Sequence, residues 1–260
     1  MKIVLDKYNC KLIHGDCLQV ISTYCESMFA MVFADPPYNL SNGGITCSSG
    51  KMVSVNKGEW DKSSGFFNDF SFTECWTEAC KQILLPYGTL WITGTYHNIY
   101  TCGFVLQSSG WHILNEIIWY KSSAPPNLSC RMFTASHESL IWAKQSPISK
   151  HQFNYELMKM SPWVKDSLKV ENKQMRSVWH ISPPLKEEKK YGKHPTQKPL
   201  ALLERIILSC TNPGDWILDP FCGSGTTGVA ALSHGRNFVG IDSDLNYLKS
   251  LAAPRLKKYF

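Results

Sequence analysis

The sequence Asp35-Pro36-Pro37-Tyr38 brings a carboxylate, two backbone carbonyls and an aromatic ring together in one short segment. It directly follows the apolar run at residues 28–33, which has the length and composition of a buried parallel strand. Two consecutive prolines stop both helix and strand, so the segment predicts a rigid turn at a strand's carboxyl end. Open α/β sheets bind their ligands at that end.

These groups suit a planar substrate that carries an amine, such as a nucleobase. Such an amine is a poor nucleophile because its lone pair is delocalised into the ring. Acceptors, here the Asp35 carboxylate and the Pro36 carbonyl, would draw the nitrogen towards a tetrahedral geometry and localise the lone pair in the transition state. Tyr38 could stack on the base. Taken alone, the motif is also compatible with an ordinary proline-rich loop.

A second segment, Asp-Pro-Phe-Cys-Gly-Ser-Gly-Thr-Thr at residues 219–227, follows an apolar strand at 216–218 and precedes a predicted helix at 228–233. Its two glycines allow the backbone to pass close to a ligand at the start of that helix. Asp242, at the end of the next predicted strand, is placed where an acid meets a ribose. No lysine follows the glycines, which argues against a phosphate-binding loop. Because Phe221 could pack against an adenine, the segment favours a nucleoside cofactor over a structural turn.

Alternating strands and helices around these segments predict an α/β fold. A strand at 11–14 leads to Asp16, the N-cap of a helix at 17–24, and capping alone would also explain this residue. Pro199 opens an amphipathic helix over 198–207. Further helices are predicted at 72–84 and 98–108, and further strands at 89–93, 113–120, 139–143 and 237–241, with 113–120 and 139–143 as an antiparallel edge pair.

Two stretches lack this regular pattern. Residues 39–68 are rich in serine, glycine, asparagine and lysine, and predict a mobile loop that could close over a substrate, with a plain solvent loop as the alternative. Residues 144–193 interleave basic and aromatic side chains, as a surface that holds phosphates and contacts base edges requires. A solvated connector would also be charged, but the block as a whole is a candidate DNA-reading insertion.

The composition of the chain limits the classes of protein to which it can belong. The chain has 260 residues, of which 43% are hydrophobic, enough for the core of one large α/β domain. No apolar stretch has the length of a membrane span and the start does not resemble a signal peptide, so we expect a cytoplasmic protein. The ten cysteines form no Cys-x-x-Cys pair, which favours reduced thiols over disulfides or zinc. The net charge of +6 fits a polyanionic partner without requiring one.

Together, the two motifs resemble the signature motifs of DNA methyltransferases that methylate amino groups. Their order, with the catalytic motif first and the cofactor motif near the C-terminus, is similar to the β group of that family. The resemblance covers nearly the whole chain. The sequences at 41–45, 57–61 and 126–131 are further similar to the second adenine methylase of DpnII-type restriction systems, which implies the target GATC and tolerance of single-stranded DNA.

The resemblance implies a Rossmann-like, doubly wound and mostly parallel sheet with a circularly permuted motif order. Its parts would be a catalytic half (1–143), a DNA target-recognition insertion (144–193) and a cofactor-binding half (194–260). Asp35, Pro36, Pro37 and Tyr38 would be catalytic and would engage a base flipped out of the helix. No metal is expected. The residues implied to bind S-adenosylmethionine are Asp16, Cys17, Asp35, Lys198, Asp219, Phe221, Gly223, Ser224, Gly225, Thr226 and Asp242.

The implied activity is methylation of N6 of adenine in DNA, by a monomer or homodimer whose functional partner is a cognate restriction endonuclease. Methylation of N4 of cytosine is the main alternative, although cytosine enzymes of the family more often carry serine where Asp35 stands. A nucleic-acid-binding partner without turnover, or a methylase of RNA or of protein amides, also remains open. The intact motifs argue against an inactive site, and the basic insertion argues against a small protein substrate.

Overall fold

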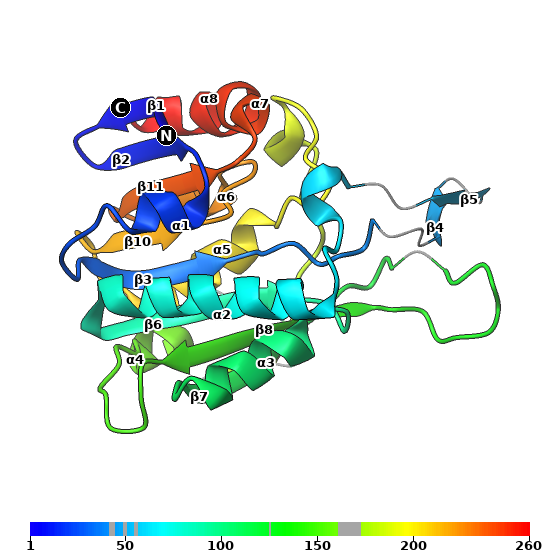
Figure 1. Ribbon diagram of the computed structural model, residues 1–260, viewed down its shortest axis with the longest axis horizontal. Coiled ribbons are helices and arrows are strands. Elements are labelled where there is room, and N and C mark those ends of the chain that lie inside the picture. The colour runs from blue at the N-terminus through cyan, green and yellow to red at the C-terminus, as the bar shows by residue number, and fades with distance from the viewer. Residues whose placement is uncertain (42–44, 49–50, 55–56, 125, 161–172) are drawn as a thin grey trace.

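In the part of the chain that the structure describes, a nine-stranded mixed sheet forms the centre and helices cover both faces (Figure 1). The computed structural model describes residues 1–41, 45–48, 51–54, 57–124, 126–160 and 173–260. The strands are β1 (Lys2–Lys7), β2 (Cys10–His14), β3 (Phe29–Ala34), β4 (Ile45–Ser48), β5 (Lys51–Ser54), β6 (Leu84–Gly94), β7 (His112–Tyr120), β8 (His137–Lys144), β9 (Val178–His180), β10 (Trp216–Asp219) and β11 (Asn237–Asp242).

The α-helices are α1 (Cys17–Ile21), α2 (Phe66–Ile83), α3 (Ile99–Ser108), α4 (Tyr155–Met160), α5 (Leu200–Cys210), α6 (Thr226–Ser233), α7 (Leu245–Tyr247) and α8 (Ala253–Leu256). The short helices of other types are η1 (Glu59–Asp61), η3 (Glu187–Lys189), η4 (Leu248–Ala252) and η5 (Lys257–Tyr259). Among the helices that the structure describes, none is long and apolar enough to cross a membrane.

The strand order is β1-β2-β11-β10-β3-β6-β8-β7-β9. Strands β2, β11, β10, β3 and β6 run parallel to one another, whereas β8 is antiparallel to both β6 and β7. This confirms the predicted doubly wound, mostly parallel sheet and the antiparallel pairing of β7 with β8. That pair is not the edge, however, because β9 adds parallel to β7 outside it.

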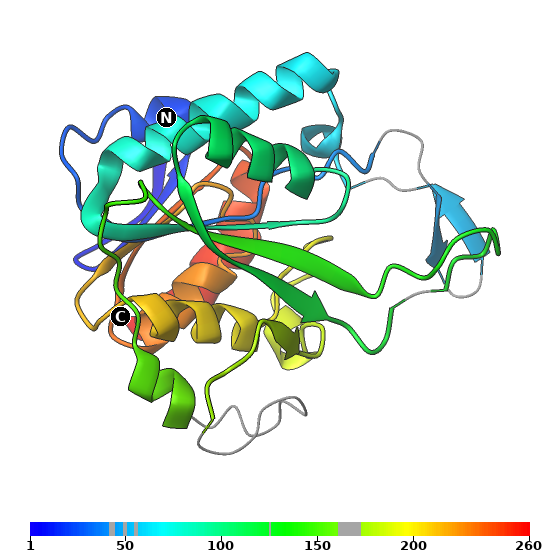
Figure 2. The same ribbon diagram turned by 90° about the horizontal axis from the view of Figure 1, so that it is seen from below.

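The central strand β3 is buried along its whole length, which explains its unbroken apolar sequence. Met31 and Phe33 point into the core shared with α5, α6 and α8. Val32 and Ala34 point the other way, into the core shared with α1, α2 and α3. Figure 2 shows the two helix layers on opposite sides of the sheet.

The topology brings the two sequence motifs together. Because β2, β11, β10 and β3 are parallel neighbours, their carboxyl ends meet at one edge of the sheet. Asp16 follows β2, Asp242 ends β11, Asp219 ends β10, and Asp35 follows β3. The strand that begins the permuted order, β2, lies beside β11 as the motif order implied.

Some elements differ from the expectations. Residues 39–68 were expected to lack regular structure, but they contain the antiparallel pair β4–β5 and the start of α2. The first turn of α2 carries exposed Phe66 and Phe67, so hydrophobic periodicity could not reveal it. The predicted mobility of this loop falls partly on residues 42–44, 49–50 and 55–56, which lie outside the described residues.

One strand at the sheet edge was not predicted, and another begins earlier than expected. β1 forms an antiparallel hairpin with β2 at the sheet edge, where a mostly exposed strand gives a weak hydrophobic signal. β6 begins at Leu84 rather than near Thr89, and so contains Pro86. The register between β3 and β6 shifts in this stretch, and a proline is tolerated at such an irregularity.

Part of the segment 144–193 belongs to the main core. Met158 of α4 and Trp179 of β9 are buried. The Trp179 ring lies 6.2 Å from that of Trp91 and 5.0 Å from the guanidinium of Arg205 on α5. Residues 161–172 lie outside the described residues, and a DNA-reading role for the segment stays a prediction.

The burial of Trp179 tests whether this segment is a detachable insertion. We expect Trp179→Ala to lower the free energy of unfolding by about 3–5 kcal/mol, because it leaves a cavity against Trp91 and β7. Tyr191→Ala, at a 40% exposed residue of the same segment, is the matched control and should have little effect. Urea unfolding followed by circular dichroism measures both, and equal small losses would show that β9 is dispensable.

Candidate functional site

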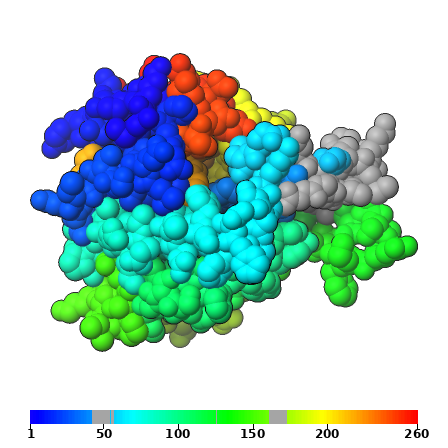
Figure 3. Space-filling view, viewed as in Figure 1, coloured from blue at the N-terminus to red at the C-terminus, as the bar shows by residue number. Residues whose placement is uncertain are grey.

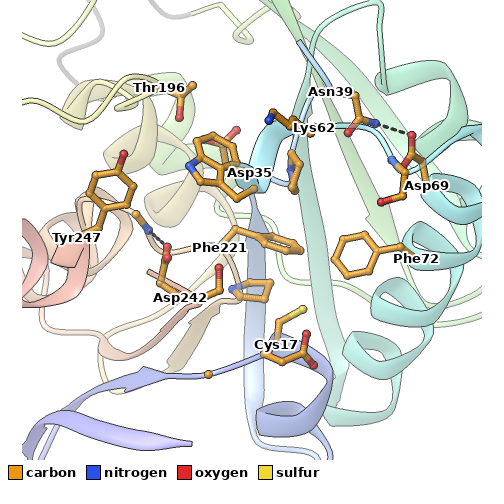
Figure 4. Close-up of a pocket in the computed structure, with 18 of the residues that line it drawn as sticks. Cys17, Asp35, Asn39, Lys62, Asp69, Phe72, Thr196, Phe221, Asp242 and Tyr247 are labelled. Carbon is orange, nitrogen blue, oxygen red and sulfur yellow. Dashed lines mark hydrogen bonds between the residues drawn. The ribbon is translucent and has the colours of Figure 1, made fainter. Parts of the chain in front are cut away.

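A cavity of about 390 Å³ opens at the carboxyl ends of β2, β11, β10 and β3. Figure 3 shows the surface hollowed where the N-terminal segment, α2 and the C-terminal helices meet, and Figure 4 shows the side chains inside. The volume suits a nucleoside-sized ligand. The predicted site residues that line it are Asp16, Cys17, Asp35, Pro37, Phe221, Gly223 and Asp242.

Asp35 is held by three donors. Its Oδ1 accepts from the Tyr38 hydroxyl at 2.7 Å and from the Thr93 hydroxyl at 2.6 Å. Its Oδ2 accepts from Lys198 Nζ at 2.5 Å. Each carboxylate oxygen has about two lone-pair positions, so Oδ1 is filled while Oδ2 keeps one acceptor position for a further donor.

Tyr38 is buried, and its hydroxyl also lies 3.2 Å from Glu138 Oε2. Burial, together with Asp35 and Glu138, raises the pKa of Tyr38, so the phenol keeps its proton and donates it. Because the ring is only 5% exposed, the expected stacking of Tyr38 on a base is not available in this arrangement. The side chain instead fixes the orientation of Asp35, and its catalytic role stays a prediction.

Lys198 connects the segment before α5 to the turn after β3. Its ammonium lies 2.5 Å from Asp35 Oδ2 and 3.8 Å from Glu138 Oε2, and Glu138 forms a second ion pair with Lys121. Burial lowers the pKa of Lys198, but Asp35 and Glu138 raise it overall. Two carboxylates and two ammonium groups thus balance in one network. Lys198 was expected to bind the cofactor, which stays a prediction, and in this structure its ammonium contacts the Asp35 carboxylate.

Phe221 and Asp242 form the other end of the cavity. The Phe221 ring is set edge-on to Trp76 at 5.5 Å and lies 6.2 Å from Phe72, which faces it in Figure 4. Asp242 Oδ2 accepts from the backbone amide of Gly223 at 2.6 Å, and Oδ1 accepts from that of Asp244 at 2.7 Å. Burial raises the pKa of Asp242, although these amides lower it. Each oxygen keeps a position that can accept from a ligand hydroxyl.

Asp16 and Cys17 line the cavity on the side of β2. The Asp16 carboxylate accepts from the amide of Gln19 at 3.0 Å, so it caps α1 and faces the cavity at the same time. Burial raises the pKa of Cys17 to about 12, which keeps the thiol protonated and makes it an apolar wall rather than a nucleophile.

Five of the expected cofactor residues do not line this cavity: Lys198, Asp219, Ser224, Gly225 and Thr226. Asp219 accepts from the Phe221 amide and the Thr227 hydroxyl, and burial raises its pKa to about 7. Gly225 has φ +74°, and a Cβ there would lie 3.0 Å from Ala252. The last four residues hold the loop in shape, and the contact of all five with a cofactor stays a prediction.

A buried arginine donates hydrogen bonds to the hydroxyls of Ser224 and Thr226 in that loop. Arg255 Nη1 donates to Ser224 O at 2.8 Å, to Ser224 Oγ at 3.0 Å and to Thr226 Oγ1 at 2.9 Å. The resemblance implied that Ser224 and Thr226 bind the cofactor, and this stays a prediction. The C-terminal helix α8 supplies this arginine and anchors the loop from inside.

Three aromatic residues form a wall that the sequence reasoning missed. The Trp60 ring is stacked on that of His194 at 6.2 Å and 19°, and His194 meets Tyr247 edge-on at 4.4 Å. They come from η1, from the segment before α5 and from α7. Burial lowers the pKa of His194 to about 4, so the imidazole is neutral. The only sequence signal was the tryptophan within the unusual stretch 57–61.

Two further carboxylates tie the catalytic turn to the following loop. Asp61 is buried and accepts from the amide of Tyr38 at 2.9 Å, the amide of Leu40 at 3.1 Å and the hydroxyl of Ser41 at 2.9 Å. Asp69, at the start of α2, accepts from Asn39 Nδ2 at 3.1 Å. The backbone after Tyr38 is therefore set by residues more than twenty positions downstream.

The neutral His194 gives the site a measurable pH dependence. The unfolded chain binds a proton at this residue below about pH 6.5, whereas the native protein binds it only near pH 4. We therefore expect wild type to lose stability relative to His194→Gln as the pH falls from 7 to 5. Chemical unfolding across this range measures the difference. The exposed residue His112, changed to Gln, is the control, and parallel curves for wild type and His194→Gln would contradict a buried neutral imidazole.

Comparison with known proteins identifies the family. A family model described as DNA methylase, of the N6 and N4 class, matches residues 29–253. The type II methyltransferase M2.DpnII of Streptococcus pneumoniae is 50% identical over 247 residues, which cover 95% of this chain and 89% of that protein. M2.MboI of Moraxella bovis, also a type II methyltransferase, is 45% identical over 244 residues, covering 94% and 86%.

The fold agrees with this similarity. The crystal structure of an M1.HpyAVI–SAM complex superposes with a TM-score of 0.67 at 28% identity, covering 95% of this chain and 98% of the other. The sheet order, the paired motifs at its edge and the sequence matches along nearly the full length all agree with the resemblance seen in the motifs. The chain belongs to the N6/N4 DNA methylase family.

Proposed function

We propose that the protein transfers a methyl group from S-adenosylmethionine to N6 of adenine in DNA. The observation that carries this proposal is the state of Asp35. Its carboxylate is fixed by Lys198, Tyr38 and Thr93, yet one acceptor position stays open on Oδ2 at the wall of a nucleoside-sized cavity. An amine donor is the group that such a position suits.

The residues around the cavity fit S-adenosylmethionine in shape and charge. Phe221 offers an apolar ring for adenine, and Asp16 and Asp242 offer carboxylate oxygens for ribose hydroxyls. Asp35 adds negative charge that suits a cationic sulfonium, and Lys62 on the same wall suits a carboxylate. When bound, the cofactor supplies a methyl group that is electrophilic because it is attached to positively charged sulfur.

The chain's own part in the reaction is to position and polarise the target amine. Asp35 Oδ2 and the Pro36 carbonyl accept its two hydrogens, which localises the nitrogen lone pair. Lys198 binds Asp35 Oδ2 and so holds the carboxylate in position to accept from the amine. Asp35 is also placed to take the proton that the nitrogen loses. An amine inside a stacked duplex is out of reach, so the base must be flipped out.

We further propose GATC as the target, in duplex or single-stranded DNA. This rests on the likeness to M2.DpnII and M2.MboI and on the DpnII-like stretches at 57–61 and 126–131. Trp60 of the first stretch lines the cavity. The basic residues of 144–193 would contact phosphates. We expect a cytoplasmic monomer or homodimer, with the cognate restriction endonuclease as functional partner.

The experiment that tests the proposal is methylation of a randomised oligonucleotide pool, single-stranded and double-stranded, with the modified positions mapped and the modified base identified. We expect N6-methyladenine within GATC. N4-methylcytosine in the product would assign the other amino group to the same site. A clear preference for RNA over DNA at matched salt would overturn the substrate class.

Removing the central carboxylate should abolish transfer. We expect Asp35→Ala to lower kcat by at least about 10²–10³-fold, the loss typical of a single group that stabilises the transition state. Cofactor affinity, measured by calorimetry, should change much less because Phe221, Asp16 and Asp242 remain. Asp6→Ala, at an exposed aspartate of β1, is the control. Full activity of Asp35→Ala would refute the catalytic assignment.

The position of Tyr38 makes a separate prediction. Tyr38→Phe keeps the ring but removes the hydroxyl that donates to Asp35 at 2.7 Å. A lost hydrogen bond of about 1.4 kcal/mol corresponds to about a tenfold lower kcat, with the KM for cofactor unchanged. If Tyr38 acted only by stacking on the target base, steady-state kinetics would show no change, because phenylalanine stacks equally well.

A further inference from the structure

The loop that joins β7 to β8, residues 121–136, projects from the same end of the molecule as the β4–β5 hairpin (Figures 1 and 2). At its base the Lys121 amide donates to Ser136 O at 2.8 Å, which extends the β7–β8 ladder into the loop. Further out, the carbonyl of Asn127 accepts from the Cys130 amide at 3.2 Å. The described residues of the loop thus begin with an extension of the β-ladder and include a defined turn at 127–130, which residues 131–133 follow.

The base of this loop touches the catalytic network directly. Lys121 forms an ion pair with Glu138, across the two strands that carry the loop. Glu138 in turn lies 3.2 Å from the Tyr38 hydroxyl and 3.8 Å from Lys198 Nζ. Glu138 at one end of the loop therefore contacts two partners of Asp35, and Lys121 at the other end pairs with Glu138. The base of the loop is thereby held next to the proposed target site.

The residues after the turn are apolar and exposed. Phe133 is 100% exposed and Met132 is 66% exposed, and both follow Arg131, which is also exposed. A single exposed apolar side chain is ordinary on a protein surface. Here two lie together, one of them with its whole ring in water, on a loop anchored at the site.

The charge of the loop fits a nucleic-acid surface. Residues 121–136 include Lys121 and Arg131 but no aspartate or glutamate. A cation beside an apolar ring is the combination found where proteins insert side chains between base steps, because the cation meets phosphate while the ring meets the base stack. A loop that approaches DNA without a carboxylate meets no repulsion from the phosphates.

From this placement we propose that Phe133 is a wedge that enters the base stack of duplex DNA beside the target and fills the space that the flipped base leaves, with Arg131 on the adjacent phosphate. The inference rests on the proposed function. The wedge stabilises the flipped state by restoring stacking. A single strand has little stacking to break, so the wedge contributes mainly to duplex substrates.

The test compares kcat/KM on a duplex and on the corresponding single strand that carry the site mapped for wild type. We expect Phe133→Ala to lower the duplex-to-single-strand ratio by at least about tenfold, as the loss of part of the stacking free energy implies. Phe133→Trp, which keeps a stacking ring, should restore the ratio. Phe67→Ala, at an 83% exposed phenylalanine on α2, is the matched control and should leave the ratio at its wild-type value.

A second measurement follows base flipping itself. Duplex DNA with 2-aminopurine at the target position should become more fluorescent on binding wild type, and much less so on binding Phe133→Ala. An unchanged ratio together with unchanged fluorescence in Phe133→Ala overturns the wedge while leaving the proposed function intact. A wild type that methylates neither form of DNA is a different result, because then the proposed function fails and the wedge with it.

Discussion

The buried ion pair between Asp35 and Lys198 joins the two halves of the protein. The partners are 163 positions apart, and the side chain of Lys198 is only 6% exposed. Breaking such a pair by removing one partner leaves an unpaired charge in a poorly solvated place, which is strongly unfavourable. The turn after β3 and the segment before α5 are therefore fixed relative to each other. The Asp35 carboxylate and the cavity beside it acquire their geometry from this contact.

Ion pairs and hydrogen bonds connect the Asp35–Lys198 pair to two other parts of the structure. Glu138 connects it to strands β7 and β8 through contacts with Lys198 and Lys121. Asp61 of η1 accepts from the amides of Tyr38 and Leu40, and the Trp60 ring, also on η1, stacks on His194. The walls of the cavity are consequently one connected system, so a ligand that moves Trp60 also acts on the backbone of the catalytic turn.

The fold could be predicted from the sequence where buried strands consist of continuous apolar residues. The apolar runs of β3, β10 and β11 revealed strands buried on both faces, and the residues directly after them proved to lie at one edge of the sheet. The hydrogen-bond and ion-pair partners of the site residues could not be predicted in this way. The contacts of Asp35 with Thr93 and Lys198 depend on strand order and on rotamers, which no local pattern encodes. No local pattern indicated that Arg255 of α8 donates to the hydroxyls of Ser224 and Thr226.

The position of β10 and β11 in the sheet has a consequence for the order in which the chain can fold. These strands are synthesised after β2 and β3, yet they lie between them in the sheet. During synthesis β2 and β3 each have an unpaired edge that stays open until residues beyond 216 leave the ribosome. Closing the sheet late requires contacts of long sequence separation, which slow folding. Asp35 likewise has no ammonium partner until Lys198, 163 positions later, has been synthesised.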